Sequence, residues 1–190
     1  MEAEKLKFDK SWTLFLDRDG VINKKLHGDY VKCISEFEFI SGVKEAIKNL
    51  SGIFGRLIII TNQQGIGKGA MQITDLEKIH DYLINEIKVS GGAIHGIYFC
   101  PDLDGSNSTS RKPATGMAFL AKKEFPEIEF AKTIMVGDSM TDMEFAKKLG
   151  MVSVYIRNGK QYDSNNNCLC DYVFNNLKEF SESIQFNNEE

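Results

Sequence analysis

Thr-Leu-Phe-Leu-Asp-Arg-Asp-Gly is the sequence of residues 13–20, and it places a short apolar run directly before a charged turn. A run of this kind, ending at polar turn residues, is typical of a strand. In parallel sheets, ligands bind beyond the carboxyl ends of the strands. We therefore expect residues 13–16 to form a strand, and Asp17 and Asp19 to lie where a ligand would bind.

The rest of the chain repeats this alternation of short apolar runs and amphipathic stretches. Strands are expected at residues 13–16, 57–60, 94–100, 133–136 and 152–156, and helices at residues 41–50, 74–89, 116–125, 140–149 and 177–184. The helix over 74–89 should be capped by Thr74, with Glu77 three residues on. The alternation predicts an α/β fold, a Rossmann-like parallel sheet of five to six strands with helices on both faces.

Length and composition fit one domain. The chain has 190 residues, 42% hydrophobic and 26% charged, which is enough apolar material for a core. We expect a single domain over residues 1–190, with its core at about residues 12–184. The net charge of −4 argues against a nucleic-acid or anionic-membrane surface. Four scattered cysteines fit the cytoplasm, and we expect a monomer with neither a secretory signal nor a membrane span.

Polar residues suited to phosphate chemistry follow four of the expected strands. They are Asp17 and Asp19 after the first, Thr61, Asn62 and Gln63 after the second, Arg111 and Lys112 in the loop after the third, and Asp138, Ser139 and Asp142 after the fourth. Each group alone has a plainer explanation as a turn, a loop or a helix cap. Four complementary groups at four successive strand ends favour one shared site.

The carboxylates of this set suit a hard cation such as Mg²⁺, because that ion prefers oxygen ligands. Asp17 and Asp138 could share it with a backbone carbonyl, and the ion would keep Asp17 ionised. Asp17 could then attack phosphorus as a nucleophile. Asp19 could serve as general acid and base, while Thr61 and Lys112 hold the phosphoryl oxygens.

These residues together resemble the haloacid dehalogenase superfamily of phosphohydrolases. The motifs that carry the resemblance are DRDGVIN at residues 17–23, TNQ at residues 61–63, Lys112, and GDS at residues 137–139 with Asp142. The sequences of these motifs are similar to those of the D-glycero-D-manno-heptose-1,7-bisphosphate phosphatases and the related histidinol-phosphatases. The resemblance covers about residues 14–157 and implies a minimal cap, Mg²⁺ dependence and an aspartyl-phosphate intermediate.

The resemblance also implies roles for individual residues. Asp17 is the nucleophile, and Asp19 is the general acid and base whose backbone carbonyl joins Asp17 and Asp138 as a metal ligand. The residues expected to face the substrate are Asn62, Gln63 and Arg111, and those expected to support the site are Ser139 and Asp142. The implied substrate is a small phosphorylated sugar, namely D-glycero-D-manno-heptose 1,7-bisphosphate, which loses its 7-phosphate in the synthesis of surface-polysaccharide precursors.

One loop departs from the family pattern. Those families commonly carry a zinc loop of Cys and His ligands after the third strand, ending just before Arg-Lys-Pro. Here Cys100 and Pro101 begin the loop, but residues 102–110 contain no further Cys or His. We therefore expect no structural zinc, because four ligands cannot be assembled locally.

Three other functions stay open from the sequence. Histidinol phosphate is the alternative substrate among the related families. Residues 61–67 and 111–117 also resemble polynucleotide 3′-phosphatase domains, although the net charge of −4 argues against a DNA substrate. A catalytically silent binding domain could use the same fold, but the four motifs lack no nucleophile, acid or metal-ligand position.

Overall fold

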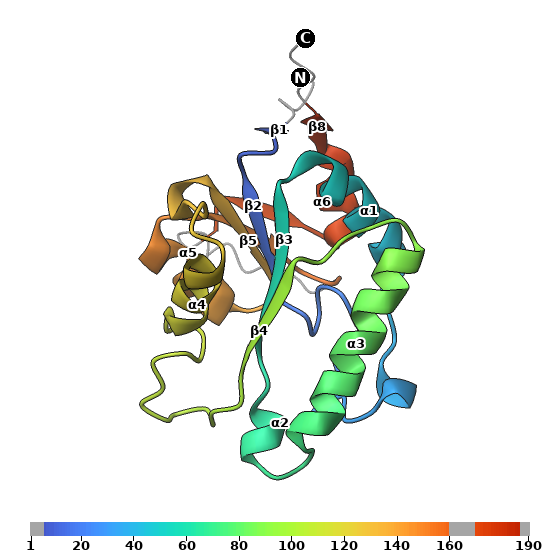
Figure 1. Cartoon of the computed structure of the whole chain (residues 1–190), viewed down its shortest axis with the longest axis vertical. Helices are drawn as coiled ribbons and strands as arrows, with labels where there is room; N and C mark the ends of the chain where they lie inside the picture. The colour runs from blue at the N-terminus through green and yellow to red at the C-terminus, as the bar shows by residue number, and fades with distance from the viewer. Residues whose placement is uncertain (1–5, 160–169, 187–190) are drawn as a thin grey trace.

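The computed structural model describes residues 6–159 and 170–186, and strands and helices alternate along it (Figure 1). The strands are β1 (Leu6–Phe8), β2 (Thr13–Leu16), β3 (Arg56–Asn62), β4 (Gly96–Cys100), β5 (Thr133–Gly137), β6 (Val152–Ile156), β7 (Tyr172–Phe174) and β8 (Ile184–Phe186). The helices are α1 (Val43–Ile53), α2 (Gln64–Gly67), α3 (Ile73–Val89), α4 (Gly116–Glu124), α5 (Met140–Leu149) and α6 (Leu177–Ser183). Two 3₁₀ turns, η1 (Ile34–Glu36) and η2 (Phe130–Lys132), complete the set.

Six strands form one sheet in the order β4-β3-β2-β5-β6-β7, and every neighbouring pair is parallel. The chain runs outward from β2 through β3 to β4, then returns to the other side of β2 with β5. The strand order therefore reverses beside β2, which is the position where such sheets leave a crevice for ligands. This topology confirms the predicted Rossmann-like sheet and places Asp17, the first residue after β2, at the crevice.

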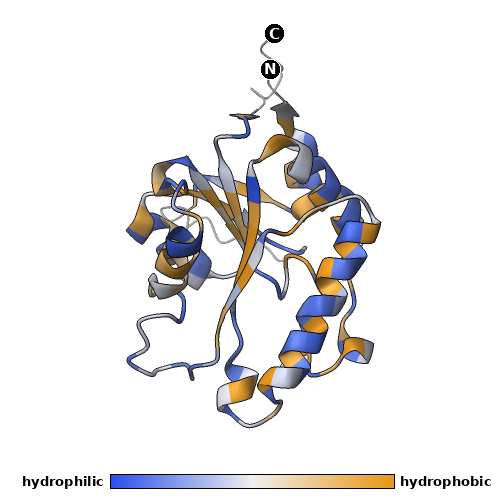
Figure 2. Ribbon diagram, in the orientation of Figure 1, coloured by the Kyte–Doolittle hydropathy of each residue, from blue (hydrophilic) through white to orange (hydrophobic). Residues whose placement is uncertain are grey.

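The two faces of the sheet build two apolar layers. Leu14 and Leu16 belong to the layer formed with α1, α3 and α6, whereas Phe15 belongs to the layer formed with α4 and α5. This assignment follows from the strand period, since successive side chains point to opposite faces. Figure 1 shows the two groups of helices on opposite sides of the sheet, and Figure 2 shows the apolar strands enclosed between them.

The loops at the crevice contain little regular structure of their own. Residues 17–42 join β2 to α1 and carry only the short turn η1, and residues 101–115 join β4 to α4 without a helix. Within the described residues there is accordingly no separate cap domain, which agrees with the expected minimal cap. Over the same residues, no helix combines the length and the apolar character needed to cross a membrane.

Two features differ from the expectation. The helix α3 begins at Ile73 and is capped by Gln72, whose backbone N–H donates to Oδ2 of Asp75 over 3.1 Å. The predicted cap at Thr74 is wrong, because Thr74 lies inside the first turn. The strands β1 and β8 pair in parallel, with Leu6 opposite Ile184, so the regular structure extends beyond the expected core of about residues 12–184 at both ends. Each of these strands has only three residues, and they come from opposite ends of the chain. Such short segments show too little alternation of apolar and polar residues to be predicted as strands from the sequence.

A matched pair of leucines tests the buried layers. Leu50 in α1 is fully buried, whereas Leu120 in α4 is 52% exposed. Replacing Leu50 with alanine should lower the free energy of unfolding by about 2–5 kcal/mol, because a cavity is left in a packed layer. The same change at Leu120 should cost about 0.5 kcal/mol or less. Urea denaturation of both variants measures the difference, and equal losses would contradict the assigned layers.

Candidate active site

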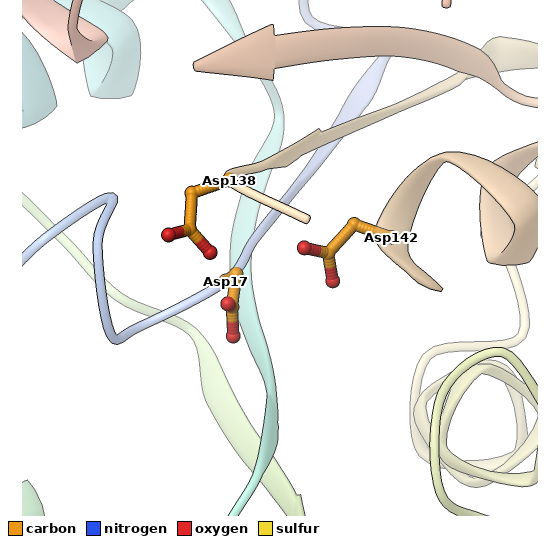
Figure 3. A group of neighbouring side chains, drawn as sticks. All are labelled: Asp17, Asp138 and Asp142. Carbon is orange, nitrogen blue, oxygen red and sulfur yellow. The ribbon is translucent and has the colours of Figure 1, made fainter. Parts of the chain in front are cut away.

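Three carboxylates meet at the crevice beside β2. Asp17 follows β2, Asp138 follows β5, and Asp142 lies in the first turn of α5. One oxygen from each lies within 4.8 Å of the other two, and all three residues are buried. Figure 3 shows the three side chains close to one another. The structure thus brings together two of the predicted metal ligands and one predicted supporting residue.

Lys112 balances part of this negative charge. Its Nζ lies 2.9 Å from Oδ1 of Asp17 and 2.6 Å from Oδ1 of Asp142, and it donates to the carbonyl oxygen of Ile60 over 2.6 Å. Burial lowers the pKa of Lys112, but the charges of Asp142 and Asp17 outweigh it and hold that pKa above its usual value. Lys112 is therefore a permanent cation between two of the carboxylates.

Asp17 remains electrostatically strained beside Lys112. Burial raises the pKa of Asp17 to about 7, because the lowering effect of Lys112 is smaller and Asp142 and Asp138 add repulsion. An ionised Asp17 thus lacks compensating charge, which a divalent cation would provide. Among residues 6–159 and 170–186, the cluster of possible metal ligands consists of carboxylates alone, the ligand type that Mg²⁺ prefers. These residues fit a hard divalent cation.

Asp19 occupies a different environment from Asp17, although it is only two residues away. Its carboxylate accepts hydrogen bonds from Arg18 Nη2 (2.9 Å), Asn23 Nδ2 (2.9 Å) and Gln63 Nε2 (2.8 Å). Burial raises the pKa of Asp19, but the charge of Arg18 and these hydrogen bonds outweigh it, so that the pKa lies below its usual value. The ionised form of Asp19 is therefore favoured, so this carboxyl group releases a proton readily and can accept one back.

Arg18 and His80 also belong to this network, and neither was predicted from the sequence as a site residue. Arg18 is fully buried, and its Nη1 lies 3.4 Å from Nε2 of His80 in α3. Burial and the charge of Arg18 lower the pKa of His80 to about 3, so His80 is neutral and can accept the hydrogen bond. Arg18 lies within the motif at residues 17–23, but nothing in the sequence indicates that an arginine between two aspartates is buried.

Thr61, Gln63 and Asn62 connect the site to β3. Gln63 Nε2 donates to Thr61 Oγ1 over 2.9 Å as well as to Asp19, which couples a predicted phosphate contact to the predicted acid and base. The side chain of Asn62 pairs with the backbone of Lys112 in both directions, through Nδ2 to the carbonyl oxygen (3.1 Å) and from the N–H to Oδ1 (3.0 Å). Asn62 and Gln63 therefore hold other site residues in position and also line the pocket.

Hydrogen bonds close the loop after β4, where the family pattern would have a zinc site. Ser108 Oγ accepts from the N–H groups of Ser110 (3.1 Å) and Arg111 (2.9 Å), and it lies 3.6 Å from Cys100 Sγ. Arg111 Nη1 donates to the carbonyl oxygen of Asp102 over 3.3 Å. A serine hydroxyl thus ties the two ends of the loop together beside Arg111, a predicted substrate contact.

Ser139 supports the site from the beginning of α5. Its Oγ donates to Asp142 Oδ2 over 2.5 Å, and its backbone N–H donates to the same oxygen over 3.1 Å. This capping arrangement fixes the Asp142 carboxylate, leaving Oδ1 for Lys112. Ser139 therefore acts as a helix cap and also supports the site by fixing Asp142, so both explanations of this segment are correct.

A pocket of about 210 Å³ lies in front of these groups. Its lining residues come mainly from the loops after β2, β3 and β4 and from the start of α5: Asp17, Arg18, Asp19, Lys25, Leu26, Asp29, Tyr30, Val31, Asn62, Gln63, Gln64, Arg111, Lys112, Ser139, Thr141 and Asp142. Lys25 was not predicted as a pocket residue. The sequence feature that could have indicated it is the pair of lysines at positions 24 and 25, in the loop after β2. The pocket has room for a small phosphorylated molecule with its phosphate against Asp17.

Comparison with known proteins agrees with this geometry. The HAD-hydrolase-like family matches residues 109–180. A D-glycero-alpha-D-manno-heptose-1,7-bisphosphate 7-phosphatase from Mycobacterium bovis is 33% identical over 173 residues, covering 91% of each chain. A D-glycero-beta-D-manno-heptose-1,7-bisphosphate 7-phosphatase from Yersinia pestis is 34% identical over 180 residues, covering 90% of this chain and 94% of that protein.

A solved structure also matches closely. The crystal structure of D,D-heptose 1,7-bisphosphate phosphatase from B. bronchiseptica, complexed with magnesium and phosphate, superposes with a TM-score of 0.80 at 26% identity. The match covers 90% of this chain and 96% of that one. Fold and site together define a phosphatase of the haloacid dehalogenase (HAD) class, a hydrolase of phosphoric monoesters. Within that superfamily, the chain belongs to the D-glycero-D-manno-heptose-1,7-bisphosphate 7-phosphatase family.

Gly20 tests how tightly the carboxylates are packed. A Cβ at Gly20 would lie 2.4 Å from Oδ2 of Asp138, whereas a Cβ at Gly28 would meet nothing within 4 Å. Both glycines have positive φ, +93° and +75°, so alanine costs about 1–2 kcal/mol of stability at either position. We expect Gly20→Ala to lose at least about a hundredfold in phosphatase activity through displacement of Asp138, and Gly28→Ala to stay within about threefold. Assays of the two folded variants decide, and equal activities would contradict the close packing.

The burial of Asp17 predicts a pH-dependent stability for the metal-free protein. Its pKa is 3.8 when unfolded and about 7 when folded, so the folded state binds more protons between these values. Stability is therefore lost as the pH rises from about 4 to 7. Asp17→Asn should be more stable than wild type by roughly 1–3 kcal/mol at pH 8, and this gain should shrink toward pH 4.5. Urea denaturation in EDTA measures it, and a gain independent of pH would contradict the assignment.

Proposed function

We propose that this phosphatase removes the 7-phosphate of D-glycero-D-manno-heptose 1,7-bisphosphate, with Mg²⁺ as its cofactor, in the synthesis of surface-polysaccharide precursors. The observation that carries the proposal is the buried Asp17, which lies at the strand-order reversal between Lys112 and the Asp138 carboxylate. The relatives from Mycobacterium bovis and Yersinia pestis, each about one-third identical over nearly the whole chain, support the choice of substrate.

In this proposal, Asp17, Asp138 and the backbone carbonyl of Asp19 hold Mg²⁺, and Asp142 supports them while paired with Lys112. The bound ion would neutralise charge on the substrate phosphate and on Asp17. The magnesium in the related Bordetella structure supports the choice of ion. The clustered carboxylates, with no histidine or thiolate ligand within the described group, support it independently.

The chain's own residues then carry the reaction in two steps. An oxygen of Asp17 forms a bond to phosphorus while the bond from phosphorus to the sugar oxygen breaks, and Asp19 supplies a proton to the leaving oxygen. A water molecule next gives its proton to Asp19 and attacks phosphorus, which releases phosphate and restores Asp17. Asp19 enters the first step protonated, and the three donors around it lower its pKa, so it releases this proton readily and is ionised for the second step.

Lys112 and Thr61 would hold the phosphoryl oxygens during both steps. Lys112 is a buried cation next to Asp17, so it lies where the phosphoryl group would arrive. Gln63 would position rather than react, because its amide ties Thr61 to Asp19. Arg111 and Asn62 line the same pocket and would face the sugar.

We also propose the cytoplasm as the place of action. The free thiols of Cys33 and Cys100 support a reducing compartment. The monomeric state and the single-domain organisation stay predictions.

Substitution of the nucleophile tests the mechanism. Asp17→Asn removes the attacking oxygen while keeping the shape of the side chain, so Mg²⁺-dependent phosphate release should fall by at least about a thousandfold. Asp81→Asn, at an exposed position of α3, is the matched control and should keep wild-type activity. Turnover in Asp17→Asn equal to wild type would contradict the covalent step.

A substrate panel tests the specificity. Both anomers of heptose 1,7-bisphosphate, histidinol phosphate and a 3′-phosphorylated oligonucleotide should be compared by kcat/KM, and a heptose bisphosphate should exceed the other two classes by at least about a hundredfold. A higher value for histidinol phosphate or the oligonucleotide would reject the proposed substrate and leave the phosphatase chemistry in place. No turnover and no Mg²⁺ binding would indicate a silent binding domain.

A further inference from the structure

Lys25 lies in the active-site pocket but has no part in the two proposed steps. Its segment is fixed by backbone hydrogen bonds from Lys24 N–H to Glu38 (2.8 Å) and from Ile40 N–H to Ile22 (3.0 Å). Successive side chains of an extended segment point to opposite sides. Lys24 therefore pairs with Glu38 at the surface, while Lys25 turns inward to Asp138.

The ammonium group of Lys25 forms an ion pair with Asp138, which is a proposed ligand of the divalent cation. Its Nζ lies 3.2 Å from Oδ1 and 3.3 Å from Oδ2 of Asp138. The Asp138 side chain is 1% exposed, whereas that of Lys25 is 50% exposed, so Lys25 covers Asp138 from the solvent side. A divalent cation on Asp138 would repel the ammonium group, since both carry positive charge. Lys25 must therefore move when the cation binds.

A substrate phosphate bound in the pocket could pair with the displaced ammonium group. Lys25 lines it together with Asn62 and Arg111. Its four-carbon stem is flexible, so the charge can turn from the carboxylate toward the pocket without moving the backbone. A bisphosphate that presents one phosphate to Asp17 places its second phosphate farther out, and charge-assisted hydrogen bonds to phosphate oxygens are among the strongest in proteins.

We propose that Lys25 is a specificity-determining residue that exchanges partners. It pairs with Asp138 in the cation-free enzyme, and it contacts the non-reacting phosphate of the substrate once a divalent cation is bound. This inference rests on the proposed bisphosphatase function and adds the group that distinguishes a bisphosphate from a monophosphate. Lys25 acts through binding and leaves the chemical steps to Asp17 and Asp19.

Paired substrates and paired variants test the specificity. Lys25→Met keeps the stem and removes the charge, and Lys24→Met makes the same change at the neighbouring surface position. At saturating Mg²⁺, Lys25→Met should raise KM for heptose 1,7-bisphosphate about tenfold, while KM for heptose 7-phosphate and both kcat values stay within about twofold. Lys25→Arg should restore most of the preference, and Lys24→Met should change neither constant. An unchanged preference in Lys25→Met, or equal increases for both substrates, would overturn the proposal.

Calorimetric titration tests the exchange without turnover. Mg²⁺ added to the metal-free protein should bind several-fold more tightly to Lys25→Met than to wild type or Lys24→Met, because no ammonium group has to be displaced. An equal or weaker affinity would overturn the exchange. Failure of the proposed function looks different, since wild type would then release phosphate from neither heptose. The titration would still decide whether Lys25 competes with the cation.

Discussion

The buried ammonium group of Lys112 is the interaction on which the site depends. It joins Asp17 after β2, Asp142 in α5 and the carbonyl of Ile60 in β3, so one charge fixes three elements of the sheet edge. The pairing of Asn62 with the Lys112 backbone adds the loop after β4. A buried cation removed from such a cluster would leave carboxylates without compensation, which is costlier than losing a surface pair. The interactions of Lys112 therefore both hold these elements together and position the residues of the active site.

Asp17 and Asp19 show how two neighbouring carboxyl groups acquire different properties. Burial, with added repulsion from Asp142 and Asp138 that Lys112 only partly offsets, raises the pKa of Asp17 to about 7. Asp19 is surrounded by donors, and its pKa is lowered. Opposed environments of this kind separate the roles of nucleophile and proton carrier. The group that needs an added cation and the group that needs none are only two residues apart.

The sequence predicted the features that arise from local pattern. Residues 13–16 and 140–149 have the predicted bounds, and the polar residues after the strands meet because parallel strands end at one edge. Features that depend on distant packing were not predictable. Buried Arg18 contacts His80 in α3 and Gln63, the residue after β3, and Lys25 reaches Asp138 across 113 positions of the chain. The cap of α3 was misplaced because glutamine is an unusual capping residue.

Ser108 organises the loop between β4 and Arg111 through hydrogen bonds. A loop closed by hydroxyl and backbone hydrogen bonds depends on contacts that each contribute about 1 kcal/mol. Such a loop can open by local fluctuation without unfolding the sheet beneath it. The segment that carries Arg111 to the phosphate pocket is therefore held by hydrogen bonds that can exchange with water.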